Sequence, residues 1–198
     1  IANPDEELGS PSSRPHILEA ARASDACLVM ECARANGDIV SARKGFRDLR
    51  ITVTGRAAHA GVEPEKGRSA IVEAAHQVAG LHALNGRWPG VSVNVGVIEG
   101  GIRPNVVPER CVLQVDVRAT TRAAFDAVAG AIRDLAAAPI VPDTRVLVEE
   151  LIGHAPMERL PRSVRLVEHA QAIARGLGFE VRDASTGGAG DANITAGA

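Results

Sequence analysis

Residues 91–97 read Val91-Ser92-Val93-Asn94-Val95-Gly96-Val97, in which valine alternates with small or polar residues. This period of two predicts a strand that buries one face and exposes the other. Residues 111–117 repeat the pattern, with an apolar side chain at every odd position. Two glycines end the first segment, and a proline-containing loop leads to the second. The two segments therefore predict neighbouring strands of a half-buried sheet.

The residues on both sides of this pair extend it into a compact module. Residues 46–55 form another alternating segment, and residues 145–151 read as the last strand. Helices are predicted at residues 67–84 and 120–138, where apolar side chains recur at helical spacing until glycine or proline stops them. The order β-α-β-β-α-β predicts an α+β module, an antiparallel sheet covered by two helices, at residues 46–151.

The flanking residues follow a different pattern. Residues 25–30 form an almost continuous apolar run that ends at Glu31, which is typical of a strand buried on both faces of a parallel sheet. The flanks contain three further predicted elements, namely helices at residues 16–24 and 163–177 and a strand at residues 179–181. The fold class is therefore α/β, with the domain divided into residues 1–45 and 152–198 by the inserted module.

Charge and composition exclude several classes of protein. A formal net charge of -2 gives no reason to expect a nucleic acid or an anionic membrane as a partner. No apolar run approaches the ~20 residues that span a bilayer. The three cysteines, Cys27, Cys32 and Cys111, are odd in number and lack CxxC spacing. They predict free thiols and hence a cytoplasmic protein.

The candidate chemistry begins at Asp5-Glu6-Glu7, three consecutive carboxylates between a proline and a glycine. Adjacent carboxylates repel each other, so a folded site that holds them together usually contains a cation or shared protons. The alternative is a solvated turn, because acids, proline and glycine are ordinary loop residues. Glu31, at the end of a predicted strand, has the same two interpretations.

Five separate motifs occur in an order that carries a family resemblance. They are Asp5-Glu6-Glu7-x-Gly9-Ser10, His59-Ala60-Gly61, Pro104-Asn105-Val106-Val107-Pro108, Asp116-Val117-Arg118 and Gly187-Gly188-x-x-Asp191-Ala192. In this order they resemble the di-zinc aminoacylase and glutamate carboxypeptidase-like exopeptidases, which include acetylornithine deacetylase and succinyl-diaminopimelate desuccinylase. The resemblance implies a zinc-peptidase α/β domain interrupted by a lid or dimerisation domain. It also implies metal-dependent hydrolysis of an amide bond in a peptide or small molecule with a free carboxylate.

The resemblance assigns roles to the carboxylates. Glu6 would be the general base that activates metal-bound water, Glu7 would ligate one zinc, and Glu31 would ligate the other. A carboxylate oxygen is a good zinc ligand, and an unligated carboxylate can take the proton from a metal-activated water. Exchanged roles of Glu6 and Glu7, or participation of Asp5, are the alternatives. The resemblance implies two zinc ions per full-length subunit, with cobalt or manganese as alternative metals.

The resemblance also assigns substrate-binding residues and a partner. His59 would hydrogen-bond the developing oxyanion in the active site of a second subunit. Asn105 and Arg118 would hold the carboxylate of the substrate, since a guanidinium can donate two parallel hydrogen bonds to it. Gly187 and Gly188 would line the substrate cleft. The expected assembly is a homodimer formed through residues 46–151, with a monomer as the alternative.

The sequence departs from the family at both ends. Residues 1–3 read as the end of a strand, and residues 192–198 read as a helix that is interrupted. The family's first His-x-Asp motif, its metal-bridging aspartate and its last histidine ligand have no counterparts here, which leaves each zinc with one protein ligand. The full-length parent is therefore predicted to be the hydrolase, and this piece to be inactive. A non-catalytic dimerisation or binding module is the alternative.

Overall fold

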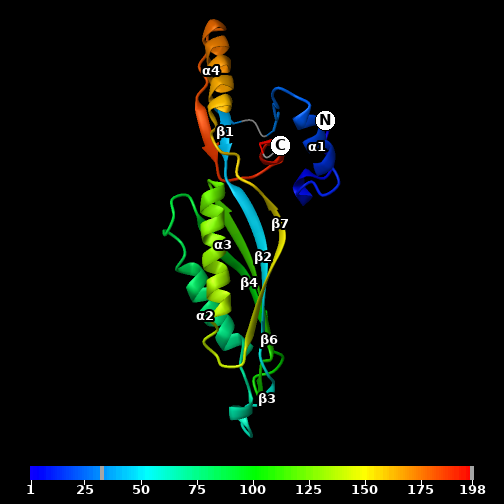
Figure 1. Ribbon diagram of the computed structural model, residues 1–198, viewed down its shortest axis with the longest axis vertical. Helices are drawn as coiled ribbons and strands as arrows, with labels where there is room; N and C mark the ends of the chain where they lie inside the picture. The colour runs from blue at the N-terminus through cyan, green and yellow to red at the C-terminus, as the bar shows by residue number, and fades with distance from the viewer. Residues whose placement is uncertain (32–33, 197–198) are drawn as a thin grey trace. The chain divides into compact units, whose positions relative to one another are not determined.

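A computed structural model describes residues 1–31 and 34–196 of the chain. Two compact units make up these residues. Unit 1 comprises residues 1–46, 119–122 and 153–198, and unit 2 comprises residues 47–118 and 123–152. Both units contain helices and strands (Figure 1).

The sheet of unit 2 has four strands in the order β4-β6-β2-β7. Their bounds are β2 Gly45–Thr54, β4 Ser92–Gly100, β6 Arg110–Ala119 and β7 Arg145–His154. Two helices, α2 (Ala70–His82) and α3 (Arg122–Ala137), lie against the sheet (Figure 1). β4 pairs antiparallel with β6, with Val93 opposite Val117, and its register shifts between Val95 and Val97. The predicted β-α-β-β-α-β order is confirmed.

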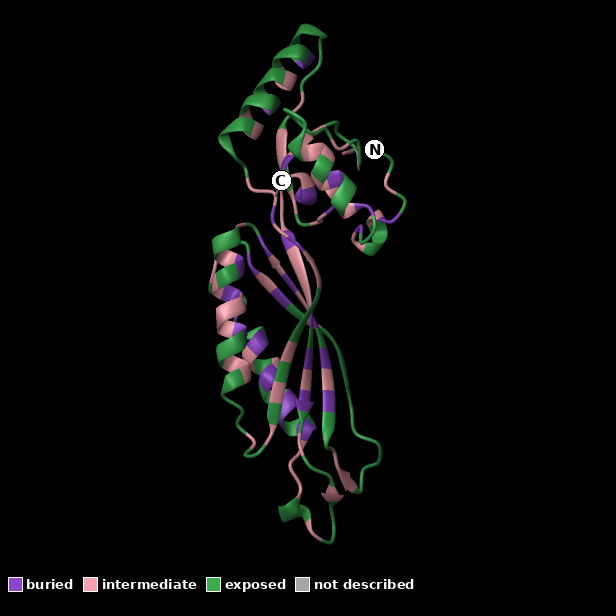
Figure 2. Cartoon of the chain, turned by 45° about the vertical axis from the view of Figure 1, so that its right-hand side comes forward, coloured by how far each residue is buried: buried purple, intermediate pink, exposed green. Residues whose placement is uncertain are grey.

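The alternation of apolar and polar residues along the strands decides which side chains form the core of unit 2. Every second residue of β6 is buried, as are Leu49, Ile51 and Val53 of β2, and Figure 2 shows buried positions as purple bands along the strands. Phe125, Val128 and Ile132 form the buried stripe of α3 at helical spacing. The α2 and α3 helices approach closely, since a Cβ at Gly80 would lie 2.7 Å from Leu135 Cδ1.

A small antiparallel ladder completes unit 2. It pairs β3 (Ala58–His59) with β5 (Val106–Val107), and the short 3₁₀ helix η2 (Pro64–Lys66) follows β3. Gly55, just before this ladder, has no room for a side chain, because a Cβ there would lie 2.0 Å from the carbonyl oxygen of Arg68.

Unit 1 pairs β1 (Ile39–Arg43) in parallel with β8 (Asp183–Thr186). Its helices are η1 (Glu6–Leu8), α1 (Arg14–Arg22), α4 (Pro161–Gly176) and α5 (Asp191–Thr195). Several of its buried side chains are polar, including Asp5, Ser10, Ser13, Ser41, His154 and Asn193. None of the helices within the described ranges is long and apolar enough to cross a membrane.

Three local expectations in unit 1 are wrong. Residues 25–30 are irregular, and Leu28 and Met30 are 78% and 91% exposed. A strand buried on both faces needs neighbouring strands, and no strand of the described chain pairs with this segment. Residues 1–3 are not a strand, and the strand expected at residues 179–181 lies at Asp183–Thr186, beside β1. Cys32 and residues 197–198 of the expected last helix lie outside the described residues.

Candidate functional site

The three N-terminal carboxylates lie on a closed turn. Leu8 N–H donates to Asp5 O at 3.1 Å, and Ser10 N–H donates to the same oxygen at 2.9 Å. The Asp5 carboxylate accepts hydrogen bonds from the hydroxyl and the backbone N–H of Ser12. The hydrogen bond from the Ser12 hydroxyl, followed by those from the Ser13 hydroxyl and the Ser12 N–H, lowers the pKa of Asp5 to about 2. Asp5 therefore holds together the turn that contains Glu6 and Glu7.

Glu6 lies in an environment that disfavours its charged form. Burial is the main cause of its raised pKa, and the negative charges of Glu31, Glu7 and Asp191 add to it. The cation Arg43 acts in the opposite direction. A raised pKa moves a carboxylate toward the working pH of a general base.

The glycine-rich loop, residues 187–190, approaches Glu6 most closely at Gly190. The sequence predicts no role for Gly190. A Cβ at Gly190 would lie 2.6 Å from Arg43 Nη1 and 3.0 Å from Glu6 Oε1, so the loop approaches both side chains only because this residue is glycine. Arg43 Nε also donates to Gly188 O at 2.9 Å. By contrast, a Cβ at Gly187 would meet nothing within 4 Å. Only the general richness in glycine could have indicated Gly190.

Asp191 is a second residue without a predicted role. Its Oδ1 accepts a hydrogen bond from Ser10 Oγ, and its Oδ2 accepts one from Asn3 Nδ2, each at 2.7 Å. Asn3 Nδ2 also donates to Ser10 Oγ at 2.8 Å. The three side chains therefore form a closed ring of hydrogen bonds. Asp191 and Ser10 both belong to the quoted motifs, but no local pattern indicates that they meet.

His59 and Asn105 lie together on the β3–β5 ladder of unit 2. Ala60 N–H donates to the carbonyl oxygen of Asn105 at 3.0 Å, which ties the two loops together. Gly61 N–H donates to His59 Nδ1 at 3.2 Å. A neutral imidazole that accepts at Nδ1 carries its proton on Nε2, so the exposed ring presents Nε2–H as a donor.

Arg118 makes a two-pronged contact with Asp116, two residues earlier on β6. Its Nε lies 2.9 Å from Oδ1 and its Nη2 lies 3.0 Å from Oδ2. This hydrogen bond is the main cause of the raised pKa of Arg118. The guanidinium thus has the geometry for bidentate binding of a carboxylate. In this structure that carboxylate belongs to Asp116 of the same strand.

The predicted residues divide between the units. Unit 1 contains Glu6, Glu7, Glu31, Gly187 and Gly188, and unit 2 contains His59, Asn105 and Arg118. Glu31 is exposed, and its charge contributes to the raised pKa of Glu6. Within residues 1–31 and 34–196, no three His, Cys, Asp or Glu side chains are grouped to hold a metal ion. The described residues therefore do not form a complete zinc site.

Comparison with known proteins gives consistent matches. The family model of the peptidase dimerisation domain matches residues 41–144. Carboxypeptidase G2 of Pseudomonas sp. (strain RS-16) is 31% identical over 99% of this chain and 48% of its own length. A homologue of p-aminobenzoyl-glutamate hydrolase from Haemophilus influenzae is 29% identical over 69% of this chain and 33% of its own length. The chain therefore spans half or less of these relatives.

A solved structure extends the likeness to the fold. Aminopeptidase PepT of Bacillus cereus ATCC 10987 matches 93% of this chain and 51% of its own chain, with a TM-score of 0.76. The sequences are 25% identical over this match. The match includes residues of both units, since neither unit alone contains 93% of the chain.

Proposed function

Because this chain belongs to the M20 peptidase family, we propose that it is part of a metal-dependent hydrolase of amide bonds. The observation that carries the proposal is the environment of Glu6. Its carboxylate lies against Gly190 beside Arg43, and burial, the main cause of its raised pKa, favours its role as a proton acceptor. The names of the two curated relatives suggest a substrate with a C-terminal glutamate or another free carboxylate. The proposed cellular location is the cytoplasm, where the exposed Cys27 would stay reduced.

Glu7 and Glu31 would contribute to the metal site, with the remaining ligands supplied by the rest of the complete protein. A zinc ion, or cobalt or manganese in its place, would supply Lewis acidity when bound. Glu6 would accept the proton of the attacking water. Residues 1–45 and 152–198 would thus form part of the catalytic domain.

The residues of unit 2 would act on the substrate. His59 presents Nε2–H, the donor needed for a developing oxyanion. Asn105 and Arg118 would hold the substrate carboxylate. For this, the Arg118 guanidinium would have to bind Asp116 and the substrate together, or give up its hydrogen bonds to Asp116. Gly187 and Gly188 of unit 1 would line the cleft.

Two variants of the complete protein test the roles of the glutamates. Glu6→Gln should lower kcat by about 10²–10⁴-fold and leave the metal content nearly unchanged, because the base is lost and the ligands remain. Glu7→Ala should instead lower metal occupancy. Turnover of p-aminobenzoyl-glutamate and metal analysis of both variants provide the measurements. The reverse pattern would show that the two roles are exchanged.

The isolated 198-residue chain should not turn over this substrate with added zinc or cobalt. Its described residues supply too few ligands for a catalytic zinc, which normally keeps three. Turnover by this chain would contradict the proposed incompleteness. Lack of turnover by the complete protein would instead favour the second candidate, a dimerisation or binding module, which the match to a dimerisation domain supports.

We propose that the assembly is a homodimer formed through residues 46–151. β4 is an edge strand, and its Ile98 is 52% exposed. On α2, Ile71 and Val72 are 39% and 48% exposed. Ile71 lies close to the end of β4, since a Cβ at Gly101 would be 3.2 Å from its Cδ1. These residues give a second copy an apolar edge to cover. Sedimentation at micromolar concentration should give the dimer mass, and a monomer mass would remove the proposal.

A mixing experiment tests whether His59 acts on the partner subunit. Complete protein with His59→Ala and complete protein with Glu6→Gln should each be nearly inactive. Hybrid dimers should regain part of the activity, because one of their two sites combines an intact His59 with an intact Glu6. No recovery after verified subunit exchange would exclude the role of His59 in the partner's site.

A further inference from the structure

We infer that Asn3, Ser10 and Asp191 form a clamp that positions Glu6 and Glu7, an inference that rests on the proposed role of these glutamates. Asn3 and Ser10 bracket the η1 turn, and Asp191 begins α5, more than 180 residues later. Both bracketing residues donate to the same carboxylate. The two ends of the turn are thereby fixed to one point of the scaffold.

The chemistry of the clamp requires a carboxylate at residue 191. The two hydrogens of Asn3 Nδ2 go to Asp191 Oδ2 and Ser10 Oγ, and the Ser10 hydroxyl donates to Asp191 Oδ1. Asp191 must therefore accept at both oxygens. An asparagine has one acceptor oxygen, so at least one donor of the ring would lose its partner. A donor without a partner is costly here, because Ser10 is buried.

The backbone of Ser10 supports the same conclusion. Ser10 has a φ of 60°, in the left-handed region that a residue with a side chain rarely adopts. Gly9, directly before it, has a φ of 85°. Glycine would adopt this backbone conformation freely, whereas serine adopts it at an energetic cost. What serine adds is its hydroxyl, which makes two hydrogen bonds of the clamp.

The clamp also connects the turn to the glycine-rich loop. Asp191 directly follows Gly190, whose missing side chain makes room for Glu6 Oε1 and for the Arg43 guanidinium. Asn3 Oδ1 accepts a hydrogen bond from Asp5 N–H at 3.0 Å, which fixes the start of the turn. A shift of the clamp would therefore move the glutamate carboxylates relative to Arg43. Asn3, Ser10 and Asp191 are positioning residues and need not touch the substrate.

Amide hydrogen exchange of the 198-residue chain tests the clamp without any assay of activity. The N–H groups of Leu8, Gly9 and Ser10 are hydrogen-bonded within the turn. In Asp191→Asn and in Ser10→Ala, these three amides should exchange about tenfold faster or more. The amide of Ile39, which donates to Arg182 O in the β1–β8 region, should keep its rate. Unchanged turn amides, or an equal acceleration at Ile39, would overturn the inference.

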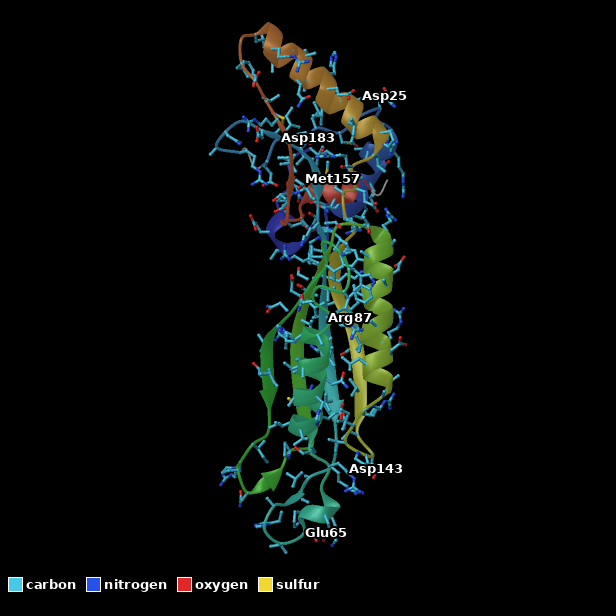
Figure 3. The ribbon with its side chains drawn as sticks, turned by 90° about the vertical axis from the view of Figure 1, so that its left-hand side faces the viewer. Asp25, Glu65, Arg87, Asp143, Met157 and Asp183 are labelled. Carbon is cyan, nitrogen blue, oxygen red and sulfur yellow. The ribbon has the colours of Figure 1, made fainter. Side chains whose placement is uncertain are left out.

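Asp183→Asn is the matched control. Asp183, labelled in Figure 3, is a carboxylate of the same unit that also accepts from two side chains, Ser41 and Arg159. It is not among the charges that shift the pKa of Glu6. Its substitution should accelerate exchange at Ile39 and leave the turn amides unchanged. Accelerated turn amides in Asp183→Asn would show that the clamp has no specific effect.

Ser10→Gly separates the hydroxyl from the backbone. This variant relieves the left-handed conformation and removes the hydroxyl, so the turn amides should exchange faster although the backbone is unstrained. If Ser10→Gly kept the wild-type exchange rates, the hydroxyl would have no role and the clamp would be refuted.

Kinetics of the complete protein give the functional readout. Asp191→Asn and Ser10→Ala should lower kcat by about 10–100-fold and change KM by less than about threefold, because misplaced groups mainly affect the chemical step. Asp183→Asn should change neither constant. An unchanged kcat in both clamp variants would refute a role in positioning. If the unmodified complete protein had no activity, the proposed function would fail, and hydrogen exchange would still decide whether the clamp exists.

Discussion

Unit 1 and unit 2 bury different kinds of side chain. In unit 2 the buried residues are apolar almost throughout, and Glu73 and Gln77 are its buried polar residues among those described. In unit 1 the buried polar residues, such as Asp5, Ser10 and Asn193, outnumber the buried large aliphatic ones. Unit 2 is therefore held mainly by hydrophobic burial, and unit 1 depends more on hydrogen bonds between side chains and backbone.

The difference indicates where chemistry can be placed. Polar groups inside a folded unit must be paired, so they fix the positions of their neighbours. Glu6 and Glu7 lie in the unit whose interior consists of such pairs. His59 and Arg118 belong to the apolar unit, and His59 is the exposed residue of the short β3–β5 ladder.

The largest loss of stability should come from a substitution that creates a large cavity in the core of unit 2. Phe125 is 2% exposed and lies among Leu49, Val117 and Val128. Phe125→Ala should lower the free energy of unfolding of unit 2 by about 3–5 kcal/mol. Urea unfolding followed by the fluorescence of Trp88, the chain's one tryptophan, measures this. Phe125→Leu, which keeps more of the volume, is the control and should cost less. An equal loss at residue-resolved probes of unit 1 would contradict the independence of the two interiors.

A smaller loss is expected from a buried amide of unit 1. Asn193 accepts from Gly190 N–H and donates to the carbonyl oxygens of Lys44 and Ala155. Asn193→Ala should destabilise unit 1 by about 2–3 kcal/mol, because buried backbone groups lose their partners. Asn85 of unit 2 makes a similar set of three bonds but is exposed, so Asn85→Ala should cost about 1 kcal/mol or less. Hydrogen exchange in denaturant compares the two, and equal losses would refute the effect of burial.

Gly190→Ala should affect the site more than stability. The new Cβ would meet the ends of two flexible side chains, Arg43 and Glu6, which can move at a cost of less than about 1 kcal/mol. The displaced Glu6 should lower kcat of the complete protein by about tenfold. Gly176→Ala, where a Cβ meets nothing within 4 Å, should lower neither stability nor kcat. A wild-type kcat in Gly190→Ala would show that the position of Glu6 is not critical.

The smallest effect should be a larger loss of stability on acidification in unit 1 than in unit 2. In unit 1 the pKa of Asp5 is about 2, below its ordinary 3.8, so its stabilising contribution is lost as pH falls from about 4 to 2. Burial first, and then Arg14, lower the pKa of His154, whose contribution is lost as pH falls below about 6.5. In unit 2, burial and Asp116 raise the pKa of Asp48, so protonation of Asp48 favours the folded state, as protonation of Glu6 does in unit 1.

Urea unfolding at several pH values between 7 and 3 measures this difference. Probes of unit 1 should lose stability on acidification, and Trp88 should report a smaller loss in unit 2. His154→Asn removes one titrating group, so it should reduce the loss of unit 1 between pH 6.5 and pH 5. A steeper loss at Trp88 than at the probes of unit 1 would contradict the prediction.

The sequence predicted unit 2 better than unit 1, for a physical reason. Alternation and helical spacing are local patterns, and in unit 2 they match the faces that are buried, as at Val93 and Phe125. In residues 25–30 the same kind of reasoning fails, because an apolar run indicates a buried strand only if neighbouring strands exist. The strand near residue 180 was displaced by a few residues for the same reason, since pairing with β1 decides its position.

The site shows the same limit. Glu6, Glu7 and Glu31 could be singled out because five motifs in order resemble a family in which such carboxylates have assigned roles. Ser10 and Asp191 could not be joined, because their contact bridges 181 positions of sequence. Gly190 is one of several glycines in its loop, and only the approach of Glu6 and Arg43 distinguishes it.

The first and the last crossing of the chain between the two units lie on adjacent strands, β2 and β7. Near these two points Arg47 Nη1 lies 3.5 Å from Glu150 Oε2, so the entry and the exit are side by side. An inserted segment whose two ends lie side by side can be gained, lost or exchanged by recombination without distorting the domain that contains it. The same property offers a practical route in engineering, because residues 47–152, which carry residues 119–122 of unit 1 with them, could be replaced by a short linker or exchanged between relatives as one segment.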